Sequence, residues 1–109
     1  MRKYYSDVKL NEKMDRFNHY LYLFIPRAGF TSYGSFAEAV GISRQTCYMV
    51  RHGKVKPSKL RYLAMRALLE NELSPEDNAQ LKNMLGEKQT DDWMEEVMYV
   101  GVDPYPYPK

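Results

Sequence analysis

Residues 33–52 read YGSFAEAVGISRQTCYMVRH, and this stretch decides the fold. Its spacing fits two short helices that meet at a steep angle across a tight turn. A small residue, Ala37, stands where the second helix has to cross the first, and Gly41 stands in the turn, where a positive φ is needed. The side on which the two helices would face each other carries apolar residues: Phe36, Val40, Ile42, Cys47 and Val50.

Two parts of this region resemble the lambda-repressor-like helix-turn-helix family, which comprises phage repressors, Cro proteins and related bacterial regulators. They are FAEAVGISRQT at positions 36–46 and HGKVKPS at positions 52–58. The resemblance extends over roughly residues 17–69. It implies a domain of typically five helices, the third of which lies in the major groove of DNA.

The resemblance also implies functional positions. The outward face of the third helix would read base edges through Arg44, Gln45, Tyr48 and Met49. An arginine suits the two acceptors of guanine, and a glutamine suits adenine. Helix starts and the loop after the third helix would contact phosphates through Tyr33, Ser43, His52 and Lys54, joined by the nearby cations Lys56 and Lys59.

Helical periodicity extends the fold towards the N-terminus. Apolar residues alternate in steps of four and three, which predicts a helix that ends before Pro26: Leu10, Met14, Phe17, Leu21 and Phe24. We expect residues 29–34 to form a loop, and Ser35 and Ser43 to cap the two central helices.

Two further helices are predicted after the central stretch. Ser58 would cap a fourth helix, whose buried face is predicted to consist of Leu60, Leu63, Ala64, Ala67 and Leu68. Ser74 and Pro75 would begin a fifth helix, which ends at Gly86 and buries Leu81, Met84 and Leu85.

The end of the chain leaves two alternatives open. Residues 90–98 can form a sixth helix with Trp93 and Val97 on one side, or the β-prone residues 97–102 can form a short strand. Residues 103–109, with three prolines, predict an extended tail. The expected fold class is therefore all-α with five or six helices, and with one short C-terminal strand at most.

Charge is divided unevenly along the 109 residues. Residues 1–66 hold 13 Lys and Arg against 4 Asp and Glu, a balance of +9, whereas residues 67–109 have a balance of −7. Residues 43–66 contain seven Lys and Arg and no acid. This asymmetry favours a polyanion-binding face and a separate region that stays away from the polyanion.

Other classes of function find little support in the sequence. No nucleophile elbow, Gly-rich phosphate loop or paired-carboxylate arrangement is present, so we expect a protein that is not an enzyme and has no cofactor or small-molecule ligand. One cysteine and two histidines argue against a disulfide or a metal site. With no apolar run of membrane-spanning length and no secretory signal, a cytoplasmic location is expected.

We accordingly divide the chain into a DNA-binding domain, residues 1–89, and an acidic C-terminal segment, residues 90–109. The C-terminal segment is the expected dimerisation element, with Trp93, Val97, Met98 and Tyr99 at the subunit interface.

The expected function is that of a sequence-specific regulator of phage or mobile-element type. It would repress transcription by binding a pseudo-palindromic operator in double-stranded DNA as a homodimer. Two alternatives stay open: an assembly protein, such as a phage DNA-packaging subunit that uses the same motif in an oligomer, or a module that binds a host protein.

Overall fold

The computed structural model describes residues 6–100, and these residues form six helices and no strand. The helices are α1 (Asp7–Arg27), α2 (Tyr33–Val40), α3 (Arg44–Arg51), α4 (Lys59–Glu72), α5 (Pro75–Met84) and α6 (Trp93–Tyr99). The prediction of an all-α fold is confirmed. Of the two alternatives for the C-terminal end, the helix is correct, because residues 97–99 belong to α6. The proline-rich tail lies outside the described residues.

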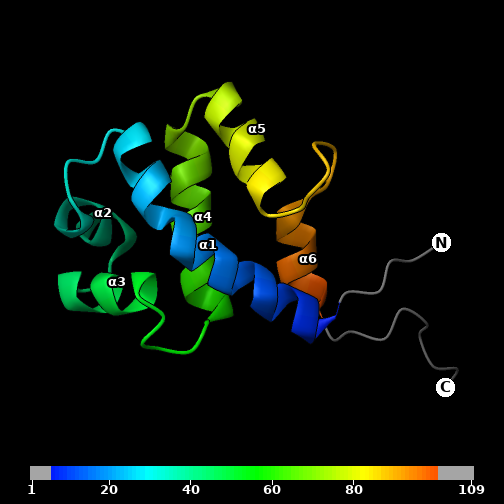
Figure 1. Ribbon diagram of the computed structural model, residues 1–109, viewed down its shortest axis with the longest axis horizontal. Coiled ribbons are helices and arrows are strands. Elements are labelled where there is room, and N and C mark those ends of the chain that lie inside the picture. Colours follow the sequence, from blue (N-terminus) through cyan, green and yellow to red (C-terminus); the bar gives the residue numbers. More distant parts are fainter. Residues whose placement is uncertain (1–5, 101–109) are drawn as a thin grey trace, which may run out of the picture.

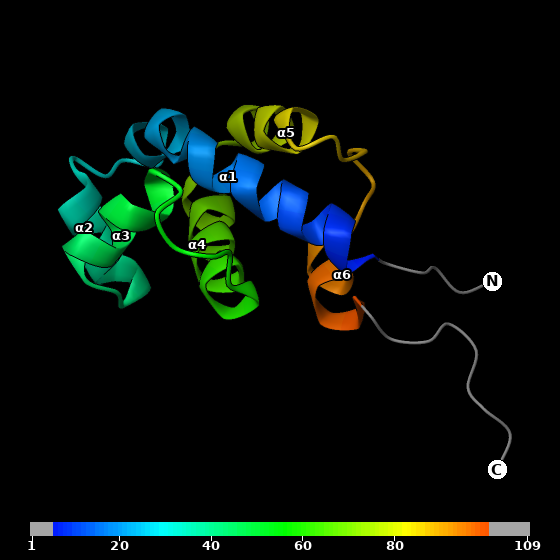
Figure 2. The ribbon, with the colours of Figure 1, turned by 60° about the horizontal axis from the view of Figure 1, so that its bottom comes forward.

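Helix α1 is the central element of the molecule. Figure 2 shows α5 on one side of it and α4 and α6 on the other, and both figures show α2 and α3 together at one end. The start of α1 and the end of α6 lie side by side at the opposite end. The fold therefore separates the α2–α3 pair from the C-terminal helix.

The core follows the predicted apolar stripe of α1. All five residues of the stripe are buried, and Phe17 meets Tyr62 of α4 edge-on, with ring centroids 5.0 Å apart. Phe36, Cys47 and Val50, from α2 and α3, belong to the same cluster. Burial raises the pKa of the Cys47 thiol, which keeps it in its neutral form.

Two helix boundaries differ from the sequence prediction. Helix α1 continues through Pro26 to Arg27, because the fixed φ of proline is compatible with a helix and only one hydrogen bond is lost near its end. Helix α2 begins at Tyr33 rather than after Ser35. Ser32 is the N-cap, and Ser35 completes a capping box by accepting a hydrogen bond from the Ser32 N–H (3.2 Å).

The buried face of α4 also differs from the prediction. Tyr62, Met65, Arg66 and Leu69 are buried, whereas Leu60 is 78% exposed and Ala64 and Ala67 are exposed. Leu63 and Leu68 are half-buried against the core, so the prediction is wrong for Leu60, Ala64 and Ala67. It placed Arg66 on the surface, which turned the helix by part of a revolution.

Arg66 is buried by a network of charged and aromatic side chains. Its guanidinium makes a two-pronged contact with the Glu87 carboxylate and donates to the Tyr62 hydroxyl. Lys13 bridges Glu87 (3.0 Å) and Glu96 (2.9 Å), so the network joins α1, α4 and α6. Burial alone would raise the pKa of Glu87, but hydrogen bonds and charge attraction from Arg66 and Lys13 outweigh it and lower that pKa.

Helix α6 is part of the same core. Trp93 meets Tyr62 edge-on, with centroids 5.8 Å apart, and its indole N–H donates to Glu70. The core thus continues across residue 89, where the sequence suggested the start of a separate segment. None of the helices between residues 6 and 100 combines the length and hydrophobicity needed to cross a lipid bilayer.

Candidate nucleic-acid interface

The α2–α3 turn has the geometry that its sequence requires. Gly41 adopts φ +94°, which is in the left-handed region, and its N–H donates to the Ala37 carbonyl (2.8 Å). Ile42 donates to the same carbonyl at 3.0 Å. Ala37 itself is buried, and a small side chain there leaves room for α3 to pack against α2.

The turn brings the starts of α2 and α3 close together. Ser43 caps α3 by accepting a hydrogen bond from the Thr46 N–H (3.0 Å). Arg44, the first residue of α3, lies over Gly34 in the first turn of α2, where an added Cβ would meet the Arg44 Cδ at 3.5 Å. Two helix N-termini and one guanidinium therefore share a small area of surface, and together they favour an anion or a hydrogen-bond acceptor.

The four predicted base-reading residues lie on the outer side of α3 to different extents. Arg44, Gln45 and Tyr48 are exposed, whereas Met49 is only half-exposed. Tyr48 contacts two neighbours. Its ring centroid lies 4.2 Å from that of His52, and the Lys54 Nζ lies 5.8 Å from the Tyr48 centroid. The side chains that α3 turns inward are Cys47 and Val50.

The predicted phosphate-binding residues differ in what they already contact. Lys54, Lys56 and His52 are exposed in and around the loop after α3, and Lys54 and His52 also lie against the Tyr48 ring. Lys59 is exposed but lies 3.7 Å from the Asp7 carboxylate, and the Ser43 hydroxyl is engaged in the cap and donates to Thr46 Oγ1 (2.8 Å).

Two arginines of the acid-free stretch are not available to a polyanion in the way their sequence suggests. Arg66 is 2% exposed and lies in the core. Arg51 is half-buried, with its guanidinium 4.7 Å from the ring centroid of Tyr22 on α1. The exposed cations of this stretch are therefore fewer than the sequence count indicates.

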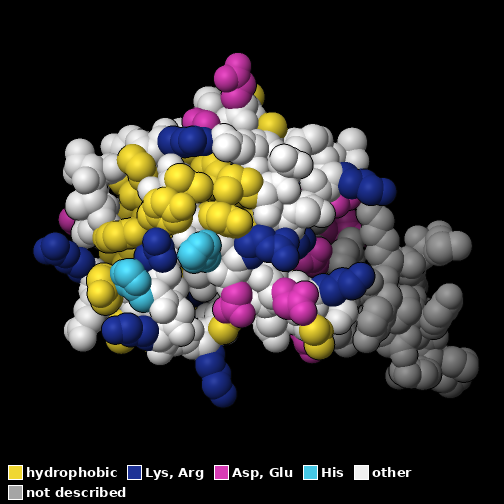
Figure 3. Space-filling model, viewed as in Figure 1, with side chains coloured by type: hydrophobic (Ala, Val, Ile, Leu, Met, Phe, Trp, Pro, Cys, Tyr) yellow, Lys and Arg dark blue, Asp and Glu magenta, His cyan; other side chains and the backbone are white. Residues whose placement is uncertain are grey.

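Several cations lie at the α2–α3 end of the molecule. In Figure 3, Lys and Arg side chains and one histidine lie over the α2–α3 end and its neighbouring loop, beside a band of hydrophobic side chains, while other Lys and Arg side chains and the second histidine lie over the rest of the face. On the same face, most of the Asp and Glu side chains lie over α5 and over the half of α1 away from that end. On this face the α2–α3 end therefore carries cations and few acids, whereas the rest of the face carries both signs of charge.

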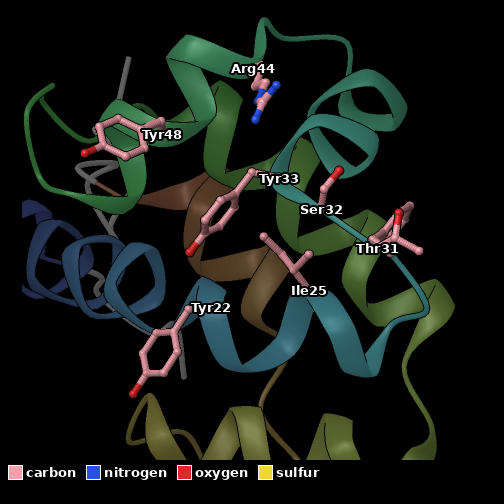
Figure 4. Close-up of a pocket in the computed structure, with 8 residues that line it drawn as sticks. Tyr22, Ile25, Thr31, Ser32, Tyr33, Arg44 and Tyr48 are labelled. Atoms are coloured by element: carbon pink, nitrogen blue, oxygen red, sulfur yellow. The ribbon is translucent and has the colours of Figure 1, made fainter.

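A cavity of about 400 Å³ opens beside the candidate base-reading residues. Figure 4 shows Arg44 and Tyr48 on its α3 side, Tyr22 and Ile25 on its α1 side, and Tyr33 between the two helices. The ring of Tyr33, predicted to lie on the DNA backbone, is half-buried in this cavity.

Sequence reasoning missed the contribution of α1 to this surface. Tyr22 and Ile25 lie next to the predicted apolar stripe rather than in it. Ile25 is buried, so the buried face of α1 is wider than that stripe, and Tyr22 lies exposed at its edge. The Ser-x-x-Ser pattern at 32–35 was the available signal for the start of α2, since it permits a reciprocal cap.

The predicted dimer residues are also divided by the structure. Trp93 and Val97 are 5% and 7% exposed within a single chain, so their assignment to a subunit interface is wrong: they fill the protomer's own core. Met98 and Tyr99 are 63% and 52% exposed on the outer side of α6. Only these two of the four remain available to a partner.

Within residues 6–100 no three His, Cys, Asp or Glu side chains lie close enough together to hold a metal ion. In comparisons with known proteins, no family model, no curated protein and no solved structure matches this chain.

Proposed function

We propose that this protein is a sequence-specific regulator that binds double-stranded DNA through a lambda-repressor-like helix-turn-helix formed by α2 and α3. It acts as a repressor of phage or mobile-element type, because a protein bound over a promoter excludes the polymerase without needing a ligand.

The observation that carries the proposal is the position of Arg44 and Gln45. Both are exposed at the start of α3, beside the start of α2, while Cys47 and Val50 anchor the opposite side of the same helix. A helix anchored in this way presents a fixed set of side chains, which is what reading base edges in the major groove requires.

The loop after α3 supports the same proposal. Lys54 and Lys56 follow the helix directly and are exposed, so they lie where a backbone crossing the groove would pass. Phosphate contacts from this loop would fix the register of α3, and Arg44, Gln45, Tyr48 and Met49 would then discriminate between sequences.

Dimerisation completes the proposal. One such motif reads only a few base pairs, and two copies on a pseudo-palindrome would lie about 34 Å apart, one turn of the double helix. Met98 and Tyr99 offer an exposed apolar contact on α6, at the end of the molecule away from α2 and α3.

The test is selection of bound duplexes from a random pool, using the full chain. We expect a two-fold symmetric consensus with guanine at the position that Arg44 reads. Recovery of sequences without any consensus, or no recovery at physiological salt, would contradict the proposal.

A further inference from the structure

The cavity between α1, α2 and α3 has the chemistry of a peptide groove. Three tyrosines (Tyr22, Tyr33 and Tyr48) line it together with Phe30 and Ile25. Aromatic rings that alternate with gaps are the surface on which proline-rich segments dock, because their polyproline II conformation is set before binding. Arg44 lies on the same lining and adds a positive charge.

A segment with the matching chemistry follows α6 in this chain. Residues 101–109 read GVDPYPYPK, in which three prolines alternate with two tyrosines and follow an aspartate. Prolines fix the backbone φ, the tyrosines offer flat apolar surface, and Asp103 offers a partner for Arg44.

The length of this segment argues for docking on a second copy. The described chain ends beside the start of α1, and Tyr22 lies 15 residues further along that helix than Asp7, about 22 Å at 1.5 Å per residue. Tyr105 is five residues beyond Val100 and reaches at most about 17 Å. Residues 103–105 therefore fall short of the cavity of their own chain, whereas Tyr107, seven residues beyond Val100, reaches at most about 25 Å. A segment that brings Asp103 to Arg44 and both tyrosines into the cavity thus requires another copy.

We propose that the Pro-Tyr segment of one copy, residues 103–108, docks in the tyrosine-lined cavity of a second copy. The contact is heterologous, so it joins copies head to tail. Because Arg44 and Tyr48 line the cavity, a docked segment also covers the surface that would read DNA; this consequence alone rests on the proposed function.

The experiment measures self-association of the full chain by sedimentation velocity over a range of concentrations without DNA. Two variants each remove one side of the contact: Tyr22→Ala in the cavity, and Tyr105→Ala with Tyr107→Ala in the segment. Each is expected to weaken association about tenfold, since truncating an anchoring interface tyrosine typically costs that much.

Mixing the two variants is the decisive step. The cavity variant keeps an intact segment and the segment variant keeps an intact cavity, so the mixture restores one wild-type contact. The mixture therefore forms a pair at a concentration about tenfold lower than that at which either variant associates alone. Leu60→Ala is the control, because it removes an exposed apolar side chain from α4, outside the cavity and outside the proposed dimer contact. It should weaken association less than the segment variant does.

The proposal is overturned if the wild-type chain stays monomeric at all concentrations, if the segment variant associates like the wild type, or if the mixture associates no more tightly than either variant alone. An association lost only in a further variant, Tyr99→Ala, also overturns it and assigns the contact to α6. In a separate arm, duplex from the selection is added. Displacement of the head-to-tail contact supports the overlap of the two sites, whereas failure to bind any duplex refutes the proposed function and leaves the sedimentation result standing.

Discussion

Arg44 and Lys56 carry the same charge at the candidate interface, but we expect Arg44 to distinguish bases and Lys56 to contact phosphate only. The Arg44 side chain extends over the start of α2, and Lys56 stands in an exposed loop. A planar guanidinium can make two hydrogen bonds to guanine, whereas an ammonium group contacts a phosphate of any sequence. Arg44→Ala is therefore expected to cost about 1–3 kcal/mol on the selected duplex and little on random DNA.

Lys56→Ala should weaken binding to both duplexes to the same extent, and competition assays with the two DNAs measure the difference. Lys88→Ala is the control, since Lys88 is exposed in the segment between α5 and α6 and should change neither affinity. Equal losses for Arg44→Ala on both duplexes would show that α3 does not read bases.

Glu87 is the residue that makes stability depend on pH. Its partners Arg66 and Lys13 hold its pKa below the ordinary value of 4.5. Between the lowered pKa of Glu87 in the folded chain and its ordinary pKa of 4.5 in the unfolded chain, the unfolded chain binds more protons than the folded one. The free energy of unfolding therefore rises with pH in this range. The contribution of Glu87 is complete above pH 4.5 and is lost as the pH falls through the folded-state pKa.

Urea unfolding at pH 7 and at pH values from 5 to 3 tests this contribution. Glu87→Gln leaves the Arg66 guanidinium buried without its counter-charge, so we expect a loss of about 3 kcal/mol at pH 7. The variant should also show a flatter decline in stability with acid than the wild type. Parallel declines in the two proteins would mean that other carboxylates control acid unfolding.

At the scale of elements, two glycines of the α2–α3 unit have opposite roles. Gly41 ends α2 with φ +94°, so Gly41→Ala forces an L-residue into the left-handed region and is expected to cost about 1–2 kcal/mol. Gly34 lies inside α2 without a positive φ, and an added Cβ there meets Arg44 and Ser32 only at ordinary contact distance.

Gly34→Ala should therefore raise stability by up to about 1 kcal/mol, because alanine is the better helix former. Thermal unfolding followed by circular dichroism compares the pair. A stabilising Gly41→Ala would mean that the turn relaxes to another conformation.

Helix α6 is expected to be required for folding. Trp93 packs on Tyr62, and its substitution by alanine removes a side chain from the middle of the core, at a cost of about 3–5 kcal/mol. A chain that ends at Gln89 should accordingly be largely unfolded at 25 °C, which far-UV circular dichroism measures. Met94→Ala is the control, since that side chain is exposed on α6 outside the proposed dimer contact and should leave the melting temperature nearly unchanged. A folded chain without α6 would restore the division of the molecule at residue 89.

Local signals account for what the sequence predicted well. Serine caps, glycine stops and 3.6-residue periodicity act over a few residues, and they located α3 and α5 closely. The failures involve distant partners. Arg66 is buried only because Glu87, 21 residues away, neutralises it, and Trp93 is buried because α4 offers Tyr62 and Glu70. The periodicity of one helix carries no information about such partners. The sequence therefore predicted neither which face of α4 is buried nor that α6 packs in the core.

At the scale of the whole molecule, the cations that are buried and paired do not contribute to the charge of the surface, and the exposed ones do. Arg66 and Lys13 are compensated by Glu87 and Glu96 at the end away from α2 and α3, whereas Arg44, Lys54 and Lys56 stay exposed without an acid in residues 43–66. These exposed cations give the candidate interface a local positive field. Such a field orients the protein on approach to a polyanion and speeds productive encounters.

This field makes salt the most informative variable for binding. Each phosphate neutralised by a cation releases counterions, so the logarithm of the association constant falls linearly with the logarithm of salt concentration, by about 0.9 per phosphate. With Arg44, Lys54 and Lys56 each at a phosphate or groove edge, and with Lys59 already beside the Asp7 carboxylate, we expect a slope of about −3 per protomer on random duplex. Lys54→Ala and Lys56→Ala should each reduce the steepness by about one. Lys88→Ala should leave it unchanged, because that residue lies outside the candidate interface. Binding that barely varies between low and physiological salt would mean that these cations do not face DNA, whatever the affinity itself turns out to be.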